Sequence, residues 1–520
     1  MNLLLALPLL PLAVALWLAA SPRAAPLGAG WPVALVAVFP IAVAALVSPM
    51  RIELPELLVE GQAALVLDAP ARAALLLFGG LWLSAGLLLT RTREAGPGAP
   101  ALLVALSGAL ALSLAEGGPL IYAGLLATGY GLYAVMAGEP GQGWRRAGRM
   151  LIVLLVVSDL LVFELLLSVR AEPGAPPGTG VLLLGLAALV LRGVVPPAHG
   201  WLPPALAAVG TPVAVLLVAA PTGAALFGAL KLLPGGMPEL APAAMVLGLG
   251  GAAWATLAGV LQAEARTTLG YAVAASAALL LLAVPAGAGP DGQLAWLGVA
   301  LLGSCAALPL VALQHASWVR DAAIAASLLV HGFAGGQVAN HAAGQLPALL
   351  LLLAPLAAVG ATLLLTLAAR RTPAVAPGDD AIEPTRLAFA PIAFGAIGLG
   401  LAWLARLPGF AALWAAPLGI TLGLVLYRAL PFRSRAAVLP GDIAFVVERA
   451  AAWALRGMAA LCSGPLPALR DRCRETVLGW WDGKRWSRRM QRLDVQLRAW
   501  PVTSLLMLVV ALGAAFLLVQ

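Results

Sequence analysis

The sequence predicts an all-α membrane protein that crosses the bilayer about sixteen times. Hydrophobic residues make up 62% of its 520 residues and charged residues only 10%, whereas soluble proteins carry roughly 25% charged residues. Stretches of about 20 apolar residues, the length that spans a bilayer as a helix, recur along the chain. This composition excludes a soluble globular domain and a disordered chain. The alternating segments typical of a membrane β-barrel are not found in it.

Sixteen segments are long and apolar enough to be transmembrane helices. Lipid cannot satisfy open backbone groups, so a helical bundle is the structure that such segments favour. The first segment lacks the basic start of a signal peptide, and we interpret it as a spanning helix. The expected spans are 2–20, 31–48, 73–90, 99–115, 118–137, 149–168, 178–197, 209–231, 240–262, 267–287, 294–313, 322–341, 346–368, 387–404, 409–427 and 500–519.

Lys and Arg are concentrated in alternate connections between the spans. Connections after odd-numbered spans hold 25 of the 31 basic residues, those after even-numbered spans hold 5, and Arg192 lies within a span. Basic connections face the cytoplasm. We therefore expect a multi-pass protein of a bacterial cytoplasmic (inner) membrane with both termini on the non-cytoplasmic side. The net charge of +8 reflects this asymmetry and does not indicate nucleic acid as a partner.

One long connection precedes the last span. Residues 428–499 mix arginines and tryptophans with apolar residues, a pattern that favours amphipathic helices lying in the cytoplasmic interface. A solvated linker is the alternative. We expect N-terminal helices over 1–117, a core over 118–404, one helix over 405–427, the interfacial segment over 428–499 and a C-terminal helix over 500–520.

Ionisable side chains within spans are candidates for function, because a charge in lipid costs roughly 2.5–3.5 kcal/mol on insertion scales. Asp159 and Glu164 are five residues apart, or about 140° around a helix, so they do not share a face. An ion pair between Arg192 and one of these acids is the economical arrangement, with either a transport or a purely structural role. The other candidates within spans or near their ends include Lys231, Glu264, Arg266 and His331.

An unusual motif follows Arg192. A proline pair ending at Pro197 precedes His199 and Trp201, and the next span begins with Gly-Thr-Pro212 and contains Pro221. We expect this eighth span to be broken. Broken helices recur in transporters, where water or protein partners satisfy their backbone groups. Proline also occurs as a simple kink in membrane helices.

These residues resemble the proton-translocating, antiporter-like membrane subunits shared by respiratory complex I, Mrp-type cation/proton antiporters and group 4 membrane-bound hydrogenases. The most specific match runs from Arg192 through Pro197-x-His-x-Trp-Leu-Pro to Thr-Pro212-Val. The number of spans, the outward termini and the surface segment fit the larger members of this family. Supporting matches are Leu65-Val-Leu-Asp68, Ala147-Gly-Arg149 and Gln262-Ala-Glu264-Ala-Arg266-x-x-Leu-Gly-Tyr271.

The resemblance implies that protons cross two half-channels joined by a row of charged residues at mid-membrane. In the family, a Glu of span 5 pairs with a Lys of span 7, and the row ends at a Lys or Glu in a broken span 12. Here Leu125 or Leu126 stands where the Glu is expected, and arginines replace two lysines. Arginine stays protonated and cannot pass a proton on. The ionisable residues of the spans and the resemblance together predict an ion pathway of Asp159, Glu164, Arg192, Lys231, Glu264, Arg266, His331, Asn340 and His341.

Three functions remain open. We favour a membrane subunit of an energy-converting, proton- or sodium-translocating complex whose own relay is altered. The alternatives are a non-conducting scaffold or coupling subunit, and a membrane subunit of an ion-driven inorganic-carbon transporter. The sequence carries no recognisable catalytic centre, and we expect no cofactor and no metal site, since its three cysteines are widely scattered. The expected partners are other membrane subunits, hydrophilic redox or other soluble subunits, and the bilayer.

Overall fold

The computed structural model describes most of the first 430 residues. The chain divides into two units, residues 1–440 and 441–520, and all described residues lie in the first. The described residues do not include the predicted spans at 387–404 and 500–519. They include only the first two residues of the predicted interfacial segment at 428–499. The described ranges are 3–20, 30–54, 63–89, 98–139, 143–171, 178–233, 235–312, 317–342, 354–371 and 415–429.

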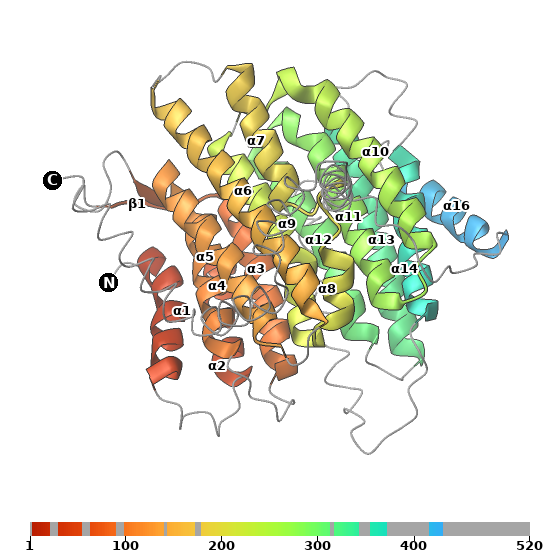
Figure 1. Cartoon of the computed structure of the whole chain (residues 1–520), viewed down its shortest axis with the longest axis horizontal. Coiled ribbons are helices and arrows are strands. Elements are labelled where there is room, and N and C mark those ends of the chain that lie inside the picture. Colours follow the sequence, from red (N-terminus) through yellow and green to blue (C-terminus); the bar gives the residue numbers. More distant parts are fainter. Residues whose placement is uncertain are drawn as a thin grey trace, which may run out of the picture. The chain divides into compact units, whose positions relative to one another are not determined.

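The described part of the chain is mainly α-helical (Figure 1). It also contains short 3-10 turns at Pro238–Leu240, Val284–Ala286 and Pro290–Gly292. The helices are α1 (Leu3–Ala20), α2 (Gly30–Leu46), α3 (Ala69–Leu89), α4 (Gly98–Leu114), α5 (Gly118–Ala137), α6 (Trp144–Ala171), α7 (Thr179–Arg192), α8 (Leu202–Ala208), α9 (Thr211–Leu232), α10 (Ala241–Val260), α11 (Ala265–Ala283), α12 (Gln293–Ala312), α13 (Ser317–Ala342), α14 (Ala354–Arg371) and α16 (Ala415–Ala429).

Seven of the described helices are long and apolar enough to cross a membrane, and five further helices are apolar but shorter. An all-α membrane protein is thus confirmed, whereas the number sixteen stays a prediction. The seventh predicted span is shorter than expected. It was placed at 178–197, but α7 ends at Arg192, because the prolines at 196 and 197 cannot continue the hydrogen-bonding pattern of a helix.

Helix α9 lies among α3, α5, α7 and α12 (Figure 1). It is composed mainly of Ala, Val and Leu, and its apolar window is buried on every side. A helix that is apolar all round belongs in the interior of a bundle. Helix α9 therefore lies at the centre of the helices that the structure describes.

The predicted breaks in spans 8 and 12 are not confirmed. The segments form single α-helices, α9 with Pro221 inside it and α13 from Ser317 to Ala342. Proline removes one backbone donor and opposes one carbonyl, and neighbouring groups in a tightly packed bundle can accommodate this loss without ending the helix. Pro221 therefore does not end α9.

A small antiparallel sheet, which the sequence did not predict, joins two of the connections. Strands β1 (Met50–Glu53), β2 (Ala64–Leu67) and β3 (Ala115–Glu116) lie in the order β1-β2-β3. Arg51 pairs with Val66, and Glu116 pairs with Ala64. An exposed ion pair of 2.8 Å links Arg51 to Glu116. The sheet places the α2–α3 and α4–α5 connections at the same end of the helices.

Candidate ion-relay site

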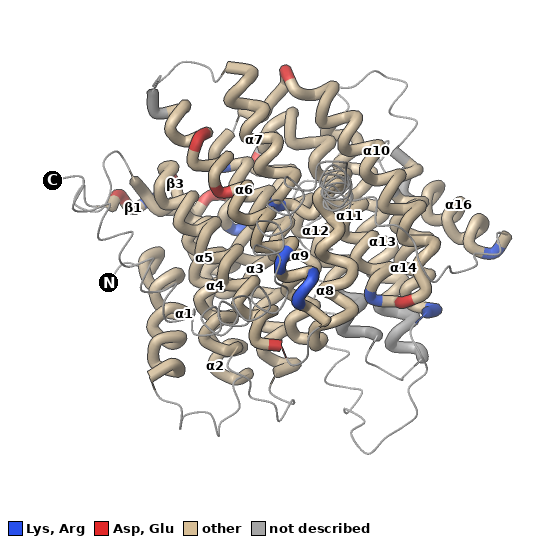
Figure 2. Tube along the Cα trace, in the orientation of Figure 1, with Lys and Arg blue, Asp and Glu red and all other residues tan. Residues whose placement is uncertain are grey.

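Arg192 is the last residue of α7, and its side chain points into the interior between α5 and α6. Only 5% of the residue is exposed. The chain turns sharply after it, since Val194 adopts a left-handed φ of 59° before the proline pair begins. The motif therefore ends the helix at the charged residue and leaves the guanidinium inside the bundle. Figure 2 marks the positions of the basic and acidic residues along the helices.

The guanidinium is held by one residue of α5 and two of α6. Its Nη2 donates to Asp159 Oδ1 in an ion pair, its Nη1 donates to the Leu125 carbonyl at 2.9 Å, and its Nε donates to Ser158 Oγ at 3.4 Å. The Ser158 hydroxyl also donates to the Ala188 carbonyl at 3.2 Å. The predicted pair between Arg192 and an acid of the sixth span is thus present. Such burial is tolerated only because the charge is paired and hydrogen-bonded.

Glu164 does not take part in this cluster. It is exposed on α6, whereas Asp159 is buried beside Arg192. The angular separation expected from helix geometry accounts for the difference, because five residues carry the two acids to different faces. The structure brings together only one of the two predicted acids and Arg192.

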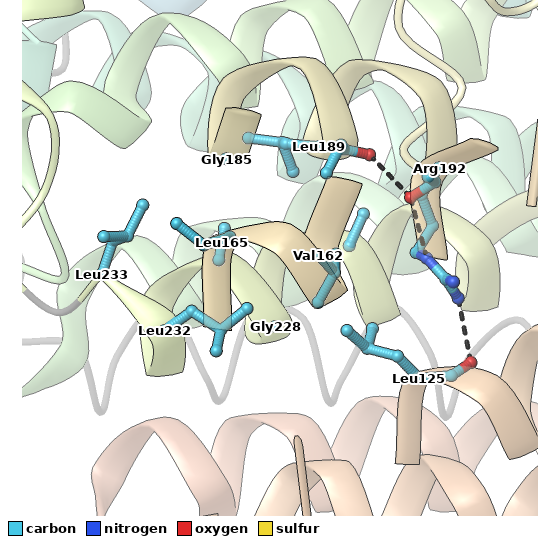
Figure 3. A pocket seen from close by; sticks show the side chains of 13 residues that line it. Leu125, Val162, Leu165, Gly185, Leu189, Arg192, Gly228, Leu232 and Leu233 are labelled. Atoms are coloured by element: carbon cyan, nitrogen blue, oxygen red, sulfur yellow. Dashed lines mark hydrogen bonds between the residues drawn. The ribbon is translucent and has the colours of Figure 1, made fainter. Parts of the chain in front are cut away.

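A small apolar cavity lies beside Arg192, between α5, α6, α7 and α9. It has a volume of about 20 Å³, enough for one water molecule. Figure 3 shows Arg192 towards one side of the cavity and Leu233 towards the other. Leu125, one of the two positions at which the resemblance predicts a carboxylate, lies close to Arg192 and supplies an apolar side chain.

A second polar cluster surrounds His331 of α13. Its Nδ1 lies 3.0 Å from Ser304 Oγ and 3.8 Å from Cys305 Sγ, and its Nε2 lies 3.4 Å from Ser276 Oγ. All four residues are buried, and they come from α11, α12 and α13. His331 was predicted, but the serines were not. Isolated serines in apolar helices carry no sequence signal, since their hydroxyls commonly bond to a carbonyl of their own helix.

The two clusters are separated by mainly apolar side chains. A cavity of about 10 Å³ is lined by the residues that follow one member of each cluster, Gly193 after Arg192 and Ala277 after Ser276. Thr222 is its polar lining residue and donates to the Gly193 carbonyl at 3.0 Å. A volume of this size is at the lower limit for a single water molecule. Among the described residues, no hydrogen bond connects the cluster at Arg192 with the cluster at His331.

Arg266 connects α11 to α8 and α9. Its Nη1 donates to the Val209 carbonyl at 2.6 Å, and its Nη2 donates to Thr211 Oγ1 at 2.7 Å. The first contact satisfies the carbonyl of the residue that ends α8, where a helix lacks internal partners, and the second joins the Thr211 hydroxyl of α9 to α11. Glu264 is the N-cap residue of α11 and accepts from the Thr267 hydroxyl at 3.0 Å. The contacts of Arg266 therefore hold α11 against α8 and α9.

The other predicted pathway residues lie apart from both clusters. Lys231 is in the last turn of α9, and the charges of Asp68 and Glu116 act on it. Asn340 is exposed near the end of α13, and His341 Nε2 donates to the Gly287 carbonyl at 3.2 Å. The structure therefore does not join the predicted row into one hydrogen-bonded chain within its described residues.

The motif loop packs His199 and Trp201 into the interior. His199 is fully buried, its ring lies edge-on to Tyr271 at 5.5 Å, and its two nitrogens have no hydrogen-bond partner among the described residues. Burial lowers the pKa of His199 to about 4. Pro212 lies in the first turn of α9, and Glu139 Oε2 accepts from the Gly210 backbone nitrogen at 2.7 Å. The motif thus fixes the turn between α7 and α9.

Comparisons with known proteins identify the fold. No family model and no curated protein matches the sequence. Among solved structures, a chain of the Mrp complex from Dietzia sp. DQ12-45-1b matches with a TM-score of 0.68 and 18% identity, over 91% of this chain and 62% of that one. A chain of respiratory complex I from Thermus thermophilus with bound aureothin matches with a TM-score of 0.61 and 20% identity, over 79% of this chain and 99% of that one.

This chain spans about three fifths of the length of the Mrp complex chain that it matches. Identities of 18% and 20% mean that the likeness concerns the fold and not the activity. The fold is the one that the motif after Arg192 indicated. The chain has the fold of the matched chains of the Mrp complex and of respiratory complex I.

Proposed function

We propose that this chain is a membrane subunit of an energy-converting, proton- or sodium-translocating complex, and that its own relay is altered at Arg192. The fold it shares with chains of an Mrp complex and of complex I supports the first part. The observation that carries the second part is the buried guanidinium held by Asp159, Ser158 and the Leu125 carbonyl. Other membrane subunits and hydrophilic subunits would complete the assembly.

The chemistry of the pair distinguishes it from a lysine–carboxylate relay. A buried lysine can lose its proton when a neighbouring carboxylate moves away, since its pKa responds to both burial and charge. Arginine keeps its proton. Arg192 therefore acts as a fixed charge that can attract or repel ions but cannot transfer a proton through its own nitrogen atoms. Asp159 remains its ionised partner.

His331 is a group of the described residues that could still exchange a proton. Neutral imidazole has one donor and one acceptor nitrogen, and the hydroxyls of Ser304 and Ser276 lie at 3.0 and 3.4 Å from its two nitrogens. Histidine also titrates close to physiological pH when its surroundings allow it. A proton path would need water to bridge the apolar gap between this cluster and Arg192.

A second candidate is a non-conducting coupling or scaffold subunit of the same kind of complex. The fixed charge at Arg192 and the apolar Leu125 favour it, because both remove a titratable member from the expected row. In this case the chain would transmit conformational change or hold its neighbours in place, and ions would cross the membrane in other subunits.

The test restores the missing groups and measures ion flux. The complex is purified with this chain and reconstituted into vesicles that contain a pH-sensitive dye. The double variant Arg192→Lys with Leu125→Glu should increase proton flux several-fold, because it supplies a lysine and a carboxylate on facing helices. The matched control is Arg192→Lys with Leu126→Glu, which places the same carboxylate one residue away on α5 and should leave flux unchanged.

Two outcomes would contradict the altered relay. Unchanged flux in the restored variant would show that the substitutions at these positions do not limit conduction. Loss of flux in Arg192→Ala, with the complex intact by size-exclusion chromatography, would show that the arginine itself belongs to an active pathway. Purification of the chain alone, without other subunits, would contradict membership of a complex.

A further inference from the structure

Helix α6 presents an exposed apolar surface that contains one carboxylate. Seven exposed residues recur at helical spacing and lie within about a third of the helix circumference, whereas Val169, near the end of α6, is exposed outside this arc. Glu164 lies within this arc, and Asp159 lies outside it. We call this surface the α6 ridge, and its apolar members are Val153, Val156, Val157, Leu160, Phe163 and Leu167.

Glu164 lies within the apolar stretch of α6 that is a candidate membrane span. The helix is the most apolar of the described candidate spans and continues to Ala171, which is about 10 Å beyond Glu164 at 1.5 Å per residue. The side-chain carboxylate of Glu164 has no hydrogen bond or ion pair with the residues that the structure describes. A carboxylate that faces lipid is strongly unfavourable, and such residues in natural proteins turn towards a partner or a cavity.

We propose that the α6 ridge binds a transmembrane helix of another subunit, and that this helix places a Lys or Arg opposite Glu164. The proposal rests on the proposed function, since it needs a complex. The apolar residues of the ridge would pack against the partner helix, as helix pairs do in membranes. The cation would neutralise Glu164 and would fix the depth and rotation of the partner helix.

A second copy of this chain does not fit the ridge. Two copies in one membrane are related by an axis along the membrane normal, so their α6 helices would run parallel in a twofold contact. Glu164 would then face Glu164 of the second copy at the same depth, and like charges repel. The partner is therefore a different protein.

The spans of this chain outside the described residues do not supply the cation either. The predicted spans at 387–404 and 500–519 contain no Lys or Arg, and neither do residues 343–353. A helix from one of these segments could cover the apolar residues of the ridge, but it carries no Lys or Arg within its span to pair with Glu164.

Site-specific photo-cross-linking of the full chain in its own membranes tests the proposal. The photoreactive residue p-benzoylphenylalanine replaces Leu160 on the ridge, which is 63% exposed, or Leu257 on α10, which is 64% exposed and serves as the control. Position 160 should capture one membrane protein through a peptide that contains a Lys or Arg within its span. Position 257 should not capture that peptide.

Substitution of Glu164 then tests the role of its charge. In the chain that carries the cross-linker at position 160, Glu164→Lys should lower the cross-link yield about tenfold or more, because it opposes two cations. Glu164→Leu should also lower it, although it makes the ridge wholly apolar. Replacement of the partner's Lys or Arg by Glu should restore the cross-link yield of the Glu164→Lys variant. Thermal unfolding of each variant in detergent verifies that it has folded.

The outcomes separate this inference from the proposed function. Cross-linking to lipid only, to a second copy or to another part of this chain would overturn it. Equal cross-link yields for the chain with Glu164 and for its Glu164→Lys and Glu164→Leu variants would overturn it as well. If other subunits co-purify with the unmodified chain while position 160 captures none of them, the inference fails and the proposed function stands. If the unmodified chain purifies alone, the proposed function itself fails.

Discussion

The buried ion pair between Arg192 and Asp159 is stable only when both of its side chains are present. Both side chains are almost completely buried, so the loss of one partner leaves an unpaired charge, which costs about 3–5 kcal/mol. We expect Asp159→Leu to lower the midpoint of thermal unfolding in detergent strongly. The double variant Asp159→Leu with Arg192→Leu should be more stable than the single variant, because it removes both charges.

Differential scanning fluorimetry of the single and double variants would measure this coupling. The other single variant, Arg192→Leu, completes the cycle and isolates the interaction between the two side chains. Equal unfolding midpoints for Asp159→Leu and the wild-type chain would mean that the pair is not buried in the membrane-embedded protein.

His199 should make stability depend on pH. Its pKa in the folded chain is about 4, below the value of about 6.5 of a free histidine. Between these values the unfolded chain binds more protons at this site, so stability is fully present above pH 6.5 and falls as the pH drops towards 4. His199→Phe should reduce the loss of stability between pH 7 and pH 4.5.

The comparison is made between variants, because carboxylates also titrate near pH 4.5. Unfolding midpoints in detergent at pH 7, 5.5 and 4.5 would be measured for the wild type, for His199→Phe and for His341→Phe. The last variant removes a histidine from another helix and should keep the wild-type dependence. An identical pH dependence in all three proteins would contradict the role of His199.

At the scale of elements, the close packing of α4 and α5 depends on glycine. A Cβ atom added at Gly131 would lie 2.7 Å from the Cβ of Ala105 and 2.8 Å from its backbone. Small residues allow membrane helices to approach closely in this way. Gly131→Ala should therefore destabilise the protein by about 1–3 kcal/mol, the usual cost of overpacking, as measured by unfolding in detergent.

Gly250 on α10 is the matched control for this substitution. A Cβ atom there would meet no atom within 4 Å, and alanine is the better helix former by about 1 kcal/mol. Gly250→Ala should leave stability unchanged or raise it slightly. If both substitutions had the same effect, steric contact between α4 and α5 would not be the cause.

Arginines at helix ends connect elements that are distant in sequence. Arg371, the last residue of α14, donates to the carbonyls of Gly259 at 3.2 Å and Val260 at 2.7 Å, where α10 ends. Arg266 does the same for the end of α8. A positive side chain at a helix C-terminus satisfies unpaired carbonyls and interacts favourably with the helix dipole. These contacts tie the helix ends together independently of any ion pathway.

At the scale of the whole molecule, the hydrophobicity of the sequence predicted where most of the described helices lie. Most predicted spans correspond to helices, and the spacing of Asp159 and Glu164 correctly placed them on different faces. The short elements were missed, because the strands have only four, four and two residues and α8 has seven. Such lengths carry no periodicity. Their formation depends on contacts between distant segments, such as Arg51 with Glu116.

The candidate site was predictable only in part, because it also depends on contacts between distant segments. Arg192 and His331 are conspicuous because they are charged or titratable in apolar segments. Ser276 and Ser304 gain significance only from the packing of α11, α12 and α13 around the imidazole. The carbonyl of Leu125, which accepts from Arg192, is a backbone group that no residue type reveals.

The small sheet also constrains the order in which the chain can be assembled. Its third strand ends at Glu116, so pairing of β2 with β3 must wait until the ribosome has synthesised the first four helices. Until then Ala64 and Leu65 have no partner on that side. Domains commonly fold from the N-terminus during synthesis. Closure of the sheet therefore requires that α1 to α4 have already been synthesised.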